Sequence, residues 1–72
     1  MKYYVDIKVQ PNGDYEVHTR ECTHLPIHEN IKYLGEFPNC KEALREAKKY
    51  YPEANGCYYC SSDCHDDNSK KF

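Results

Sequence analysis

Two short-spaced pairs of soft metal ligands constrain the fold of this chain more than any other feature of its sequence. His18 and Cys22 form an H-x3-C pattern, and Cys57 and Cys60 form a C-x2-C pattern. Structural zinc sites are tetrahedral and take four nitrogen or sulfur ligands, commonly as two such pairs that the fold brings together. A tight turn within C-x2-C directs both sulfurs at one point. The sequence therefore predicts one zinc ion per chain, bound by these four side chains.

The size of the chain makes such a site important for stability. A chain of 72 residues is one domain at most, and it buries only roughly 60% of the surface that its unfolded form exposes. Small domains commonly add a metal ion or disulfides, because the core alone barely offsets the entropy of ordering the chain. Five cysteines and four histidines fit this pattern. We expect a single zinc-binding domain over residues 1–65 and a polar tail over residues 66–72.

Charge and hydropathy exclude several classes of partner. The start of the chain reaches a charged residue too early for a signal peptide, and no apolar run approaches the roughly 20 residues of a membrane span. We therefore expect a cytoplasmic protein without a membrane partner, in a compartment where closely spaced cysteines bind metal more often than they pair. The odd number of cysteines argues against a complete disulfide framework. The net charge of −2 gives no overall attraction to nucleic acid.

Alternating residues predict a β-hairpin and a third strand. The run Tyr3–Gln10 reads as a half-buried strand. Its apolar face carries Tyr3, Val5, Ile7 and Val9. A Pro-Asn-Gly-Asp turn follows, and Tyr15–His18 resumes the alternation, which delivers His18 toward the turn that carries Cys22. Ile31–Gly35 is short and β-prone, and it is the third predicted strand.

Capping and periodicity predict one main helix. Asn39 can cap its first turn, and Glu42 can reach back to the cap as in a capping box. An apolar stripe at helical spacing follows: Cys40, Ala43, Leu44, Ala47 and Tyr51. Pro52 ends the helix, and Asn55-Gly56 supplies a permissive turn before Cys57. We therefore expect the α+β class, with a small antiparallel sheet and one main α-helix.

Other residues compete for the metal or for the thiols. Cys40 lies on the apolar stripe, so we expect it to pack in the core, whereas Cys64 can enter the site or approach Cys40. Cys57 and Cys60 can instead form a redox pair, although such pairs begin a helix within a βαβ pattern that is absent here. The cysteines can also be buried small hydrophobes or form disulfides. The alternative metal ligands are Cys64, His65 and His24.

The order of these motifs resembles the zinc-binding domain of the Ada DNA-repair methyltransferase family. The resemblance covers residues 17 to 60 and includes H-x3-C, Glu29-Asn30, Tyr33-Leu34, Phe37, Glu42-Ala43-Leu44, Ala47 and Gly56-Cys57-x2-Cys60. It implies a treble-clef-like module in which Cys22, Cys57 and Cys60 match three of the family's four zinc cysteines. His18 stands where the family has its methyl-accepting cysteine. Because an imidazole replaces that nucleophilic thiolate, the chain is more similar to relatives without repair activity, and we do not expect alkyl transfer.

Two surfaces are candidate partner sites. One is a basic arc on the helix, made of Lys41, Arg45, Lys48 and Lys49. The other is the pair Tyr58 and Tyr59 inside the C-x2-C turn, which can stack on bases or anchor a protein interface.

These surfaces predict a non-catalytic zinc module that mediates a protein or nucleic-acid interaction. The chain provides no Gly-rich oxyanion turn and no recognisable base-orienting partner, so we expect neither enzyme activity nor a small-molecule substrate. The alternatives are a disulfide-stapled structural protein, or a thiol redox protein that uses Cys57 and Cys60.

Overall fold

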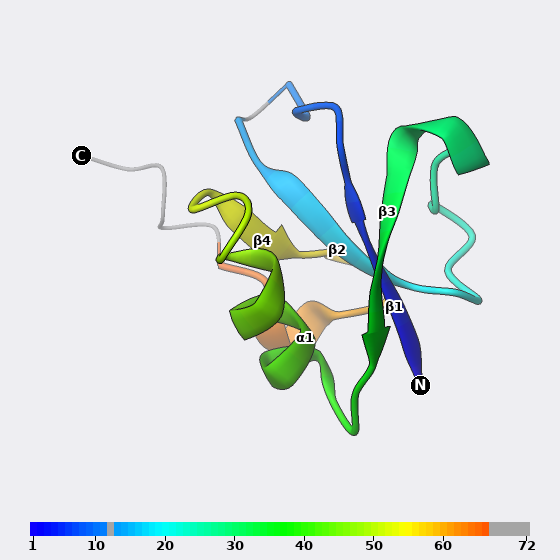
Figure 1. Cartoon of the computed structure of the whole chain (residues 1–72), viewed down its shortest axis with the longest axis vertical. Helices are drawn as coiled ribbons and strands as arrows, with labels where there is room; N and C mark the ends of the chain where they lie inside the picture. Colours follow the sequence, from blue (N-terminus) through cyan, green and yellow to red (C-terminus); the bar gives the residue numbers. More distant parts are fainter. Residues whose placement is uncertain (12, 67–72) are drawn as a thin grey trace.

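The computed structural model describes residues 1–11 and 13–66 of the chain. Within these ranges it consists of a four-stranded sheet and one α-helix (Figure 1). The strands are β1 (Lys2–Asp6), β2 (Tyr15–Thr19), β3 (Ile31–Glu36) and β4 (Ala54–Gly56), the helix is α1 (Cys40–Ala47), and two short 3-10 turns are η1 (His28–Asn30) and η2 (Ser62–Cys64). The predicted α+β class with one main helix is thus confirmed. Apart from Asp66, the predicted polar tail lies outside the described residues.

Three strands of the sheet follow the sequence pattern. The strand order is β3-β1-β2-β4, and β1 pairs antiparallel with both β2 and β3. The first of these pairings is the predicted hairpin, and the second adds the predicted third strand. No helix among the described residues has the length and apolarity that a membrane crossing requires.

The fourth strand is a feature that the sequence did not reveal. β4 runs parallel to β2 and pairs with it from Tyr15↔Ala54 to Val17↔Gly56. The sheet is therefore mixed and not wholly antiparallel as predicted, and Asn55-Gly56 belongs to a strand rather than to the predicted turn. Its three residues, Ala-Asn-Gly, have low β-propensity, and their strand conformation comes from pairing with the edge of β2. The ladder continues when the N–H of Cys57 donates to the carbonyl of Val17 at 3.0 Å. β4 therefore places Cys57 beside the strand that carries His18.

Helix α1 covers one face of the sheet and closes the core. Asn39 caps it, since its side-chain oxygen accepts a hydrogen bond from the N–H of Glu42 at 3.1 Å. The predicted stripe contributes Ala43 and Ala47 to the core. The other core residues are Tyr3, Val5, Val17 and Ala54, and the stripe residues Cys40, Leu44 and Tyr51 pack against this core partly buried. The α-helix ends at Ala47, earlier than predicted, and the chain reaches Tyr51 through a turn.

The first strand is shorter than the alternating pattern predicted. β1 ends at Asp6, so Ile7 and Val9 are 41% and 54% exposed rather than half-buried on the core face. Asp6 itself, which the alternation placed on the polar face, is only 1% exposed. The chain turns away after this buried carboxylate, and the N–H of Gln10 then bonds the carbonyl of Asp14 at 2.8 Å.

A disulfide joins the helix to the end of the described chain. It links Cys40, the first residue of α1, to Cys64, the last residue of η2. Cys40 thus packs against the core, as expected, and also forms a covalent bond. Of the two roles predicted for Cys64, the structure shows the approach to Cys40.

The disulfide contributes directly to stability. Its two cysteines are 24 residues apart in the sequence, and in the chain-entropy model a crosslink of that span stabilises the fold by about 3 kcal/mol. We expect the double variant Cys40→Ala/Cys64→Ala to lose about this much free energy of unfolding, measured by urea titration of the metal-loaded protein. A loss below about 1 kcal/mol would show that the bond does not constrain the unfolded chain.

Candidate metal centre

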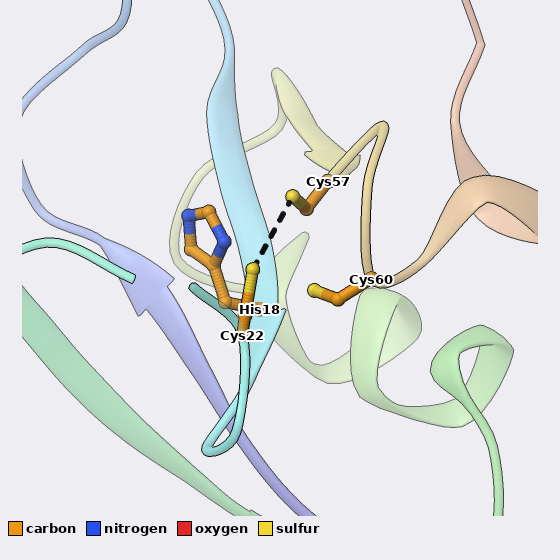
Figure 2. Close-up of side chains that lie close together, drawn as sticks. All are labelled: His18, Cys22, Cys57 and Cys60. Atoms are coloured by element: carbon orange, nitrogen blue, oxygen red, sulfur yellow. Dashed lines mark hydrogen bonds between the residues drawn. The ribbon is translucent and has the colours of Figure 1, made fainter. Parts of the chain in front are cut away.

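Four side chains from two distant parts of the chain converge beside β2. His18 belongs to β2, Cys22 follows in the next turn, and Cys57 and Cys60 lie in the turn after β4 (Figure 2). One potential ligand atom of each lies within 4.8 Å of those of the other three. These residues therefore lie close enough to bind a metal ion.

The spacing of two of the three sulfur atoms matches a tetrahedral site. The Sγ atoms of Cys22 and Cys57 are 3.8 Å apart, along the dashed line in Figure 2. In a tetrahedron with metal–sulfur bonds of about 2.3 Å, two sulfur atoms are separated by about 3.8 Å. Cys22, Cys57 and Cys60 are free thiols, whereas the other two cysteines are joined to each other.

A close backbone approach at Gly56 shapes the C-x2-C turn. A Cβ atom at this position would lie 2.7 Å from the carbonyl oxygen of Ser61 and 2.8 Å from the Cβ of Cys64. Only glycine leaves room for the chain to fold back on itself here. The turn is closed by the N–H of Ser61, which donates to the carbonyl of Cys57 at 2.9 Å.

Backbone N–H groups point at the sulfur atoms. The N–H of Thr19 donates to Sγ of Cys60 and the N–H of His24 donates to Sγ of Cys22, both at 3.3 Å. The backbone N–H groups of Tyr59 and Cys60, within the same turn, act to lower the pKa of the Cys57 thiol. Such donors stabilise thiolates, which are the forms that bind metals.

The three thiols differ in pKa because burial and hydrogen bonds act on each of them to a different extent. Burial raises the pKa of Cys57 to about 12, and burial also raises the pKa of Cys22. Burial alone would raise the pKa of Cys60 as well, but hydrogen bonds from Thr19, Ser61 and the neighbouring thiols lower it to about 7. Without a cation, Cys60 is thus the most acidic of the three thiols. A bound divalent ion would displace the remaining protons, so metal binding releases protons.

His18 is held by a buried carboxylate and offers its other nitrogen to the thiols. Nε2 lies 3.1 Å from Oδ1 of Asp6, and both side chains are 1% exposed. Within the described part of the chain, Nδ1 is buried without a hydrogen-bond partner. Figure 2 shows one ring nitrogen facing the sulfur atoms and the other pointing away. Burial alone would lower the pKa of His18, but the hydrogen bond to Asp6 and the charge of Asp6 raise it.

This arrangement is that of a metal-binding histidine with a carboxylate behind it. A carboxylate that accepts from Nε2–H fixes the tautomer in which Nδ1 carries a lone pair, and it raises the basicity of that nitrogen. An unpartnered buried nitrogen is costly on its own, and a metal ion at the cluster would give it a partner. The carboxylate of Asp6 also accepts a hydrogen bond from the side chain of Gln10. Farther along the sheet, the side chain of Asn55 donates to the carboxylate of Asp14.

Asp6 is the residue that the sequence analysis missed. Asp6, Tyr4 and His18 have side chains on the same face, because Tyr4 pairs with His18 and Val5 with Val17. The pairing register of the hairpin could therefore have predicted that Asp6 lies next to His18. Glu16 lies farther off, with Oε1 3.8 Å from Nε2.

The alternative ligands named from the sequence lie around the cluster rather than in it. The sulfur of Cys64 is bonded to Cys40. The Nδ1 atom of His65 lies 2.9 Å from the carbonyl oxygen of Gly56, and its ring stands edge-on to Tyr58. The ring of His24 stacks on Tyr59 with centroids 3.8 Å apart. Among the described residues, the remaining group with metal-site geometry is Asp6, Glu16 and His18, which shares its histidine with the first.

Both predicted partner surfaces are exposed. Tyr58 and Tyr59 are 59% and 66% exposed and meet each other edge to face. The four basic residues of the arc, Lys41, Arg45, Lys48 and Lys49, are also exposed. Arg45 pairs with Glu42 at 3.3 Å, and Lys49 pairs with Glu46 at 3.1 Å.

No family model, curated protein or solved structure matches the chain. The resemblance to the Ada family therefore stays a prediction.

The buried carboxylate gives a sharp test of the role of His18. Because Asp6→Asn preserves size but weakens the acceptor for Nε2–H, we expect the affinity for Zn²⁺ or Co²⁺ to fall by about tenfold or more. Glu16→Gln is the matched control, since Glu16 is farther from the ring, and it should change affinity by less than about threefold. Affinities are measured by competition with a chelating indicator. An unchanged affinity in Asp6→Asn would remove Asp6 from the site.

Proposed function

We propose that this chain is a small non-catalytic zinc-binding module in which one Zn²⁺, bound by His18, Cys22, Cys57 and Cys60, is part of the fold. The observation that carries the proposal is the convergence of three free thiols on a buried imidazole nitrogen without a partner of its own. Zinc is the metal that three sulfurs and one nitrogen in a tetrahedron suit best.

A structural role for the metal fits the number of protein ligands. Catalytic zinc keeps a coordination position open for water or substrate, whereas structural zinc is enclosed by four protein ligands. Here four ligands are at hand, and His18 and Cys57 are each only 1% exposed. A site of this kind stabilises a small fold, because the free energy of metal binding becomes free energy of folding.

The charge of the loaded site favours a protein partner over a nucleic acid. Three thiolates and one divalent cation carry a net charge of −1, which adds to the −2 of the chain. Nucleic acid binding depends on clustered Lys and Arg side chains, whose attraction for phosphates is weakened by negative charge elsewhere on the protein. The proposed role is therefore a zinc-stabilised module for protein interaction.

Ligand substitutions test this function. We expect the purified protein to carry one zinc ion per chain by native mass spectrometry and to lose it to a chelator. Cys57→Ser and Cys60→Ser should abolish zinc binding together with the dispersed amide NMR spectrum, because the apo form cannot satisfy the buried cluster. His24→Ala and His65→Ala are matched controls, and both should retain zinc.

Counting thiols in the same samples checks the oxidation state of the cysteines. The denatured, metal-free protein should alkylate at its three free cysteines without reductant and at all five after reduction. A Cys57→Ser protein that keeps both zinc and a native spectrum would contradict the proposed function. A metal-free protein with two disulfides would favour the disulfide-stapled alternative.

A further inference from the structure

An open groove is lined by residues of α1, by Lys48 directly after this helix, and by residues of η2. Its volume is about 400 Å³, within the range of pockets that accept small ligands or a few side chains. The lining consists of Lys41, Leu44, Arg45, Lys48, Asp63 and Cys64.

The groove combines three cations with one carboxylate. Lys41, Arg45 and Lys48 are spaced at i, i+4 and i+7, so they follow one face of the helix. Within the described residues, Lys41 and Lys48 have no ion pair, and the pair of Arg45 with Glu42 is solvent-exposed. Asp63, on η2, supplies negative charge at the groove. The lining therefore carries a net positive charge on a chain whose net charge is −2.

The groove is also partly apolar and held in place. Leu44 is half-buried among the three basic residues, and Cys64 contributes to the opposite wall. The disulfide between Cys40 and Cys64 joins α1 covalently to η2, so the two walls are tied together before any ligand arrives. A preformed groove loses less conformational entropy on binding.

We propose that this groove binds an acidic peptide segment of a partner protein. The proposal rests on the proposed zinc module, because the C-x2-C turn leads directly into η2. Carboxylates of the peptide would meet Lys41, Arg45 and Lys48, and an apolar side chain between them would cover Leu44. A peptide can also offer N–H groups or a basic side chain to Asp63, whereas that carboxylate repels the phosphate backbone of a nucleic acid. The mixed charge and apolar wall thus favour a peptide.

The binding test uses the zinc-loaded, ¹⁵N-labelled full chain. The probe is a short synthetic peptide that alternates glutamate with leucine and ends in lysine, and the comparison probes are the same peptide with glutamine for glutamate and a single-stranded oligothymidylate. We expect the glutamate peptide to shift the amide signals of α1 and η2 and to bind more tightly than either comparison probe.

Charge-reversed variants locate the site. Lys41→Glu and Lys48→Glu should each weaken binding of the glutamate peptide by about tenfold, because like charges then face each other in the groove. Lys49→Glu is the matched control. Lys49 has the same charge but is not part of the lining and pairs with Glu46, so this variant should weaken binding by less than about threefold.

Three results would overturn the proposal. The first is that about 1 mM glutamate peptide causes no shift of the amide signals. The second is that Lys48→Glu and Lys49→Glu weaken the affinity for this peptide equally. The third is that the oligothymidylate binds more tightly than the peptide, which would make the groove a phosphate-contacting face. Zinc content is measured on every sample. If the protein retains zinc but does not bind the peptide, only the proposal for the groove is refuted. If the unmutated protein contains no zinc, the proposed function itself is refuted.

Discussion

The meeting of three sulfur atoms with the buried nitrogen of His18 is the constraint on which the rest of the structure depends. It joins the end of β2 and the turn after it to the turn after β4, which lies far away in the sequence. His18 and Cys57 are buried, whereas Cys22 and Cys60 are partly exposed. Burying the imidazole nitrogen without a partner is unfavourable, and a shared cation would remove that cost. The Asp6–His18 hydrogen bond prepares the imidazole for this role, since it occupies Nε2 and leaves Nδ1 facing the thiols.

The segment that follows β4 is held by a disulfide and, in the proposed zinc-bound form, by a metal site as well. Cys57 and Cys60 connect its start to the β2 side of the molecule, and the disulfide of Cys64 connects its end to the helix. The core between them consists of one tyrosine, two valines and three alanines, which is little apolar volume for a chain of this length. The disulfide, together with a metal ion once bound, would supply stability that the small core cannot.

Much of the fold could be predicted because its signals are local. The hairpin, the third strand, the Asn39 cap and the apolar stripe of α1 depend on residues close in sequence, and the structure contains each of them. The spacing of the two ligand pairs likewise identified four residues that the fold brings together. What the sequence did not reveal, or left open as one of two roles for Cys64, depends on tertiary contacts. β4 forms because β2 offers an edge, Asp6 is buried because His18 lies on the adjacent strand, and Cys40 reaches Cys64 only once α1 and η2 are packed together.

X-ray absorption at the zinc edge tests the central claim most directly, because it reports the identity and distance of the atoms bound to the metal. The account predicts three sulfur atoms at about 2.3 Å and one nitrogen at about 2.0 Å, with the outer-shell scattering of an imidazole ring. A shell of four sulfur atoms would replace His18 with a further cysteine and require the Cys40–Cys64 bond to open. A shell of oxygen and nitrogen atoms alone would contradict the site altogether.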